Sequence, residues 1–142
     1  MKDDIKNNVK VNNNPLKEIA SKSILVVEDE FVSRQLICKI LRSNFEVEAV
    51  ETAEECFNRV SEKEYSLIFM DINLGHGISG LEAVKLLRSN NQHAKIPIVA
   101  TTAFTMPGDK EEFLDAGCSD YLSKPFTKEK LLNILKGFNL LG

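Results

Sequence analysis

Residues 24–29 read Ile-Leu-Val-Val-Glu-Asp, four apolar residues followed directly by two acids. A short apolar run with β-branched side chains is typical of a strand buried on both faces. The apolar residues that follow, from Phe31 to Leu41, recur at helical spacing and predict a helix. The stretch therefore predicts the first strand–helix unit of an α/β fold, with Glu28 and Asp29 where the strand ends.

The same alternation of strand and helix patterns continues to the end of the chain. Four more short runs are interpreted as strands, at residues 46–50, 67–70, 96–100 and 121–123. The second run alternates polar and apolar residues and the fifth is short, as edge strands are, whereas the other three are apolar throughout. We therefore expect a flavodoxin-like, doubly wound sheet of five parallel strands in the order 2-1-3-4-5, with helices on both faces.

The composition is that of one globular domain with a polar extension. The 142 residues are 43% hydrophobic and 27% charged, with a net charge of −3, which argues against nucleic acid or an anionic membrane as partner. Residues 1–22 are rich in Asn and Lys and are interpreted as a mobile tail, whereas residues 23–142 form the domain. The polar start and the absence of a long apolar run favour a cytoplasmic protein. The three cysteines are expected to be reduced and buried.

Charged and hydroxyl side chains follow four of the predicted strands. Glu28 and Asp29 follow the first strand, Asp71 the third, Thr101-Thr102 the fourth and Lys124 the fifth. Because parallel strands end at one edge of a sheet, these groups should converge there, although each acid alone would be interpreted as a loop residue or helix cap. Three clustered carboxylates require protons or a cation, and oxygen ligands favour Mg²⁺. Such a set can hold a phosphoryl group.

Four motifs in this order resemble the receiver domain of two-component response regulators. The resemblance covers about residues 23–141 and would fit a chemotaxis-type single-domain regulator or the receiver of a hybrid histidine kinase. The motifs are Leu25-Val26-Val27-Glu28-Asp29, Phe69-Met70-Asp71-Ile72-Asn73, Ala100-Thr101-Thr102-Ala103 and Tyr121-Leu122-Ser123-Lys124-Pro125-Phe126.

The resemblance implies a magnesium site beside a phosphoacceptor. Asp71 would take a phosphoryl group from a phosphohistidine, so the partner would be a histidine kinase or a histidine phosphotransfer protein. Asp29 and Asp71 would be direct Mg²⁺ ligands, Glu28 would act mainly through water, and the Asn73 backbone carbonyl would complete the set. The protein would catalyse only its own phosphorylation and dephosphorylation, and it is not expected to be an enzyme otherwise.

The resemblance also implies a switch. Thr102 and Lys124 would each bind a phosphoryl oxygen, and Tyr121 would turn inward as Thr102 moves. The face built by the last two helices and the last strand would then change its affinity for a downstream protein that the sequence does not name. A cis peptide bond is expected at Lys124-Pro125.

The sequence departs from the family pattern in the loop after the acceptor. Gly75 stands where a proline is usual, and the distance from Asp71 to Gly80 is one residue longer than in the simplest pattern, so we expect a mobile loop. Phe104, two residues after Thr102, is expected to shield the acyl phosphate from water.

Two other functions fit parts of the pattern. A non-phosphorylated interaction module could have the same fold, but the intact set of acids, Thr102 and Lys124 argues against it. A phosphohydrolase with an Asp nucleophile often carries a second Asp two residues later, where this chain has Asn73. His76 and His93 are interpreted as loop imidazoles without a chemical role.

Overall fold

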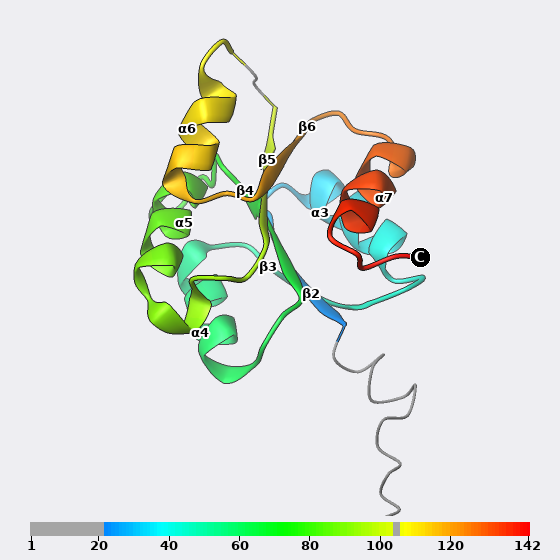
Figure 1. Ribbon diagram of the computed structural model, residues 1–142, viewed down its shortest axis with the longest axis horizontal. Helices are drawn as coiled ribbons and strands as arrows, with labels where there is room; N and C mark the ends of the chain where they lie inside the picture. Colours follow the sequence, from blue (N-terminus) through cyan, green and yellow to red (C-terminus); the bar gives the residue numbers. More distant parts are fainter. Residues whose placement is uncertain (1–21, 104–105) are drawn as a thin grey trace, which may run out of the picture.

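One five-stranded sheet forms the centre of the computed structural model, which describes residues 22–103 and 106–142 (Figure 1). All pairings between neighbouring strands are parallel, and the spatial order is β3-β2-β4-β5-β6. This confirms the predicted fold and the predicted order. In chain order the strands are β2 (Ser23–Val27), β3 (Glu46–Val50), β4 (Leu67–Asp71), β5 (Ile98–Thr102) and β6 (Asp120–Ser123).

Helices cover both faces of this sheet. Figure 1 shows α3 and α7 on one side and α4, α5 and α6 on the other. A 3-10 helix, η1 (Asn91–His93), connects α5 to β5. The helix bounds are α3 (Phe31–Leu41), α4 (Ala53–Glu62), α5 (Gly80–Ser89), α6 (Asp109–Ala116) and α7 (Lys128–Gly137).

The three inner strands, β2, β4 and β5, are buried on both faces, which explains their apolar sequences. Along β2, Ile24 and Val26 pack into the core beneath α3 and α7, whereas Leu25 and Val27 pack into the core beneath α4, α5 and α6. Alternating side chains of one strand point to opposite faces, so a strand between two helical layers needs an apolar residue at every position. The two cores hold the carboxyl ends of the central strands in place.

The edge strand β3 carries charge instead. The Glu48 carboxylate accepts hydrogen bonds from Lys63 (2.7 Å), Tyr65 (2.6 Å) and Arg59 (3.1 Å). The bonds from Lys63 and Tyr65 lower the pKa of Glu48. Val47 packs against the core beneath α3 and α7, whereas Glu46 and Ala49 are exposed, as suits a strand at the edge of the sheet.

Several local expectations are confirmed and others are corrected. Thr52 and Glu55 form a capping box at the start of α4, a pairing that the sequence Thr52-x-x-Glu55 also predicts, and Gly117 ends α6 in the left-handed conformation. The fourth strand was placed two residues too early: because Pro97 has no amide hydrogen, the strand begins at Ile98 and includes both threonines. His93, predicted to be a loop imidazole, lies in η1 and is buried.

Some expectations concern the rest of the chain. The tail predicted at residues 1–22 lies, apart from residue 22, outside the described residues, and so does Phe104. Within the described ranges, no helix is both long and apolar enough to cross a bilayer. The cysteines at 38, 56 and 118 are buried and unpaired, as expected.

Candidate functional site

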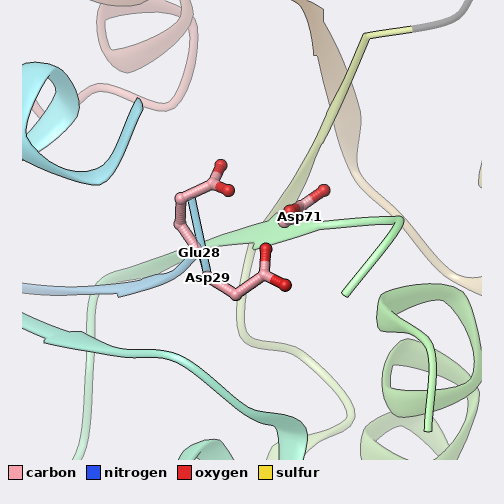
Figure 2. Close-up of side chains that lie close together, drawn as sticks. All are labelled: Glu28, Asp29 and Asp71. Carbon is pink, nitrogen blue, oxygen red and sulfur yellow. The ribbon is translucent and has the colours of Figure 1, made fainter. Parts of the chain in front are cut away.

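Three carboxylates meet at the carboxyl edge of the two central strands. Glu28 and Asp29 directly follow β2, and Asp71 is the last residue of β4. Figure 2 shows their side chains gathered around one space. One oxygen from each lies within 4.8 Å of the others, with Glu28 and Asp71 buried and Asp29 half-buried. The predicted convergence of these acids is therefore seen in the structure.

Backbone amides hold each of the three carboxylates. The donor–acceptor pairs are the Glu30 amide to Glu28 Oε2 (3.1 Å), the Asn73 amide to Asp71 Oδ1 (3.0 Å) and the Gly75 amide to Asp29 Oδ2 (2.8 Å). Because backbone donors move little, these bonds fix the carboxylates before any ligand arrives. Two of the three donors belong to the loop between β4 and α5.

Lys124 brings a positive charge to the cluster from the far strand, directly after β6. Its Nζ lies 2.7 Å from Glu28 Oε1 and 3.9 Å from Asp71 Oδ2. Glu28 Oε1 has no hydrogen-bond partner of good geometry in the described part of the chain, so this ion pair compensates its burial. One lysine against three acids still leaves the cluster negative, which favours uptake of a proton or a cation.

The Asp71 carboxyl responds to this excess of negative charge. Burial and, after it, the neighbouring Glu28 carboxylate together raise the pKa of Asp71 to about 7, although the Asn73 amide and Lys124 oppose the shift. The repulsion between the carboxylates favours a proton on Asp71, and a bound cation would relieve the same repulsion. Three carboxylates without His or Cys form a donor set suited to a hard ion, and these residues therefore fit Mg²⁺.

The remaining predicted residues lie around this cluster. Thr102 ends β5, one residue beyond the register partner of Asp71, and its carbonyl accepts a hydrogen bond from the Lys124 amide (2.7 Å). Thr102 and Asn73 border a hollow of about 280 Å³ between α5 and α6. Tyr121 is partly buried on β6, with its ring 6.2 Å from that of Phe113. The roles of Asn73, Thr102 and Tyr121 stay predictions.

Two backbone features shape the edge on which the site is built. A Cβ at Gly80 would lie 1.8 Å from the carbonyl oxygen of Asp71, so only glycine allows α5 to begin against the end of β4. The Gly80 amide donates to the Ile72 carbonyl (3.0 Å) at this junction. The Lys124-Pro125 peptide bond is cis, which confirms that prediction.

Sequence reasoning missed the groups that support the acids. Arg34 donates from Nη1 to the Glu28 carbonyl (3.0 Å), and the amides of Glu30 and Gly75 bind carboxylates. A backbone amide is present at nearly every residue, so side-chain type carries no information about it. The sequence offered one indication of this contact. Gly75 has a backbone N–H at a position where the family usually has proline, which has none.

The family model described as the response regulator receiver domain matches residues 24–136. The chain belongs to this family. Receiver domains are signalling switches of two-component systems, and the three clustered acids of this one belong to its first two sequence motifs.

Relatives of known sequence and structure support the assignment of the receiver fold. The polar-differentiation response regulator DivK of Brucella ovis is 33% identical over 119 residues, covering 83% of this chain and 96% of DivK. The chemotaxis response regulator CheY4 of Vibrio cholerae superposes with a TM-score of 0.77 at 30% identity, covering 82% of this chain and 98% of CheY4.

A third relative carries a metal. The receiver domain of the sensor histidine kinase PA1611 from Pseudomonas aeruginosa has a TM-score of 0.76 and 34% identity, covering 84% of this chain and 98% of that one. Its structure is described with a magnesium ion coordinated in the active site cleft. Both single-domain regulators and a kinase-borne receiver therefore resemble this chain.

Proposed function

We propose that this receiver domain is a phospho-accepting switch that takes a phosphoryl group from a phosphohistidine onto Asp71. The observation that supports the proposal is the convergence of Glu28, Asp29 and Asp71 with Lys124 at one edge of the sheet. An acceptor oxygen, carboxylates for a divalent cation and a fixed positive charge are the parts that phosphoryl transfer requires.

The transfer needs the ionised form of Asp71. One carboxylate oxygen attacks phosphorus, the bond between phosphorus and the histidine nitrogen breaks, and that nitrogen keeps the electron pair while an acyl phosphate forms. With a pKa of about 7, Asp71 is partly protonated at neutral pH. Bound Mg²⁺ would supply charge neutralisation for the phosphoryl oxygens and would favour the ionised carboxyl. Glu28, Asp29, Asp71 and the Asn73 carbonyl would hold it.

The other residues of the site would bind the new phosphoryl group or move in response to it. The Lys124 ammonium and the Thr102 hydroxyl would bind its oxygens, and Tyr121 would turn inward behind Thr102. The added charge stabilises one of two conformations, and a partner that prefers this conformation binds more tightly. The responsive face would be that of α6, β6 and α7.

An exposed apolar surface lies beside the acids and could contact a donor protein. The α3 patch, defined as Phe31, Val32 and Leu36, is exposed and apolar, and it begins two residues after Asp29. A donor that places its phosphohistidine on Asp71 would also cover this patch. A histidine kinase or a histidine phosphotransfer protein is the donor that we propose.

Intact-mass measurement after incubation with acetyl phosphate and Mg²⁺ tests the function. We expect one added phosphoryl group on the wild type and none on Asp71→Asn. Asp115→Asn, which removes the same charge from an exposed position on α6, should be labelled normally. Labelling of Asp71→Asn would move the acceptor elsewhere.

The other functions predict different results. A non-phosphorylated interaction module would remain unlabelled and would ignore beryllofluoride with Mg²⁺. A phosphohydrolase would release phosphate steadily from small phosphate esters. Asn73, which cannot act as a general acid or base, argues against that turnover.

A further inference from the structure

The loop between β4 and α5 contacts Asp29 through a single backbone amide. The Gly75 N–H donates to Asp29 Oδ2 at 2.8 Å, across 46 residues of sequence. A Cβ at this position would lie 3.0 Å from the same oxygen, closer than a side chain normally approaches. Gly75 is absent from the residues with positive φ, so the close approach to Asp29, and not the backbone conformation, is what favours glycine here.

We propose that Gly75 is a positioning residue for the metal site, because its amide holds the Asp29 carboxylate in the orientation that binds the cation. This inference rests on the proposed function. Asp29 is the least buried of the three acids and lies outside the Lys124 ion pair. A second-shell donor to a metal-binding carboxylate fixes its plane, and losing such a donor typically lowers metal affinity about 10- to 100-fold.

The loop is anchored so that it can hold this amide in place. Two residues earlier, the Asn73 amide binds Asp71 Oδ1 at 3.0 Å. Two residues later, Gly77 lies against α4, where a Cβ would be 3.3 Å from Glu54 Oε1. This loop therefore contacts two of the acids through its backbone amides, and its mobility stays a prediction.

Proline, the usual family residue at this position, could not form the hydrogen bond to Asp29. Proline has no amide hydrogen, so a chain with proline at position 75 cannot donate to Asp29 from there. Any partner that moves this loop would also change Mg²⁺ affinity, and by linkage Mg²⁺ would change the affinity for that partner by the same factor.

Amide hydrogen exchange measured by NMR on metal-free protein tests the contact itself. We expect the Gly75 amide to be protected in the wild type and in His76→Ala, which changes an exposed neighbour in the same loop. In Asp29→Ala the Gly75 amide should exchange faster and its proton resonance should move. Equal exchange of this amide in the wild type and in Asp29→Ala would overturn the inference.

Calorimetric titration with MgCl₂ tests the consequence. Gly75→Pro should weaken Mg²⁺ binding about 10- to 100-fold, Gly75→Ala should weaken it less because the donor remains, and His76→Ala should match the wild type. Thermal unfolding of each variant establishes that it is folded, and Gly75→Ala serves as the test if the proline variant is not. Wild-type affinity in Gly75→Pro would overturn the inference alone, whereas a wild type that binds no Mg²⁺ would overturn the proposed function as well.

Discussion

Two lysine–glutamate pairs in this protein share a distance and differ in burial. Lys124 Nζ and Lys63 Nζ each lie 2.7 Å from a glutamate oxygen, but the Glu28 side chain is 1% exposed and that of Glu48 is 28% exposed. We expect Lys124→Ala to lower the free energy of unfolding by about 3 kcal/mol, because it leaves a buried carboxylate without its cation. Lys63→Ala should cost less than about 1 kcal/mol, since water screens that pair. Urea denaturation measures both, and equal losses would contradict the argument.

The raised pKa of Asp71 should make the free energy of unfolding depend on pH. Because the folded protein binds this proton more tightly than the unfolded chain, whose value is near 3.8, the free energy of unfolding falls as pH rises from about 4 to about 7. Above that range the penalty for the buried charge stays constant. Asp71→Asn removes it, so the variant should gain at least about 1 kcal/mol more over the wild type at pH 8 than at pH 5.

Metal-free urea denaturation at the two pH values checks this difference. Asp115→Asn provides the control, because its exposed carboxylate has little to gain from the substitution. A gain for Asp71→Asn that is independent of pH would show that the Asp71 carboxyl titrates normally in the folded protein.

At the scale of elements, the junction between β4 and α5 depends on one glycine. A Cβ at Gly80 would overlap the Asp71 carbonyl, and that backbone atom can move only with the whole strand end. We expect Gly80→Ala to destabilise the protein by about 1–3 kcal/mol and to weaken Mg²⁺ binding, because it displaces Asp71. Gly137→Ala, with nothing within 4 Å of the added methyl in the last turn of α7, should be neutral or slightly stabilising. Thermal unfolding and MgCl₂ titration compare the two.

We expect the α3 patch to contribute to binding of the donor protein and not to the phosphoryl-transfer step itself. Val32 is 67% exposed, and Val32→Glu should slow phosphoryl transfer from a phosphorylated histidine phosphotransfer protein at least about tenfold. Labelling by acetyl phosphate should stay at the wild-type rate, because Asp71 and its neighbours are unchanged. Leu86→Glu, an equally drastic change on the exposed side of α5, should leave both rates unchanged. Loss of both rates in Val32→Glu would assign the patch to folding.

At the scale of the whole molecule, the sequence predicted what depends on side-chain pattern. Uniformly apolar runs marked β2, β4 and β5 as central, and the alternating run at β3 marked an edge. Because parallel strands end at one edge, the position of Glu28, Asp29 and Asp71 after their strands was enough to predict that they meet. The pattern indicated the two edge strands, the complete strand order was taken partly from a known fold, and the named roles came with the family resemblance.

What the sequence could not predict depends on backbone contacts. The Gly75 amide on Asp29 and the contact of Gly80 with Asp71 follow from the path of a loop, and that path depends on packing against α4 and β4. The shift of the fourth strand to Ile98 has a local cause at Pro97 that could have been considered. The polar residues around His93 in the sequence conceal its burial, which brings it beside apolar residues of α4 and α5 such as Phe57 and Leu87.

The buried cysteines bear on how this protein would respond to oxidants. Desolvation raises the pKa of Cys56 to about 12 and that of Cys118 to about 11, and it also raises the pKa of Cys38. Peroxide attacks thiolates, and at neutral pH these side chains are thiols enclosed by the two cores. We therefore expect peroxide to leave these three cysteines unmodified while the protein stays folded.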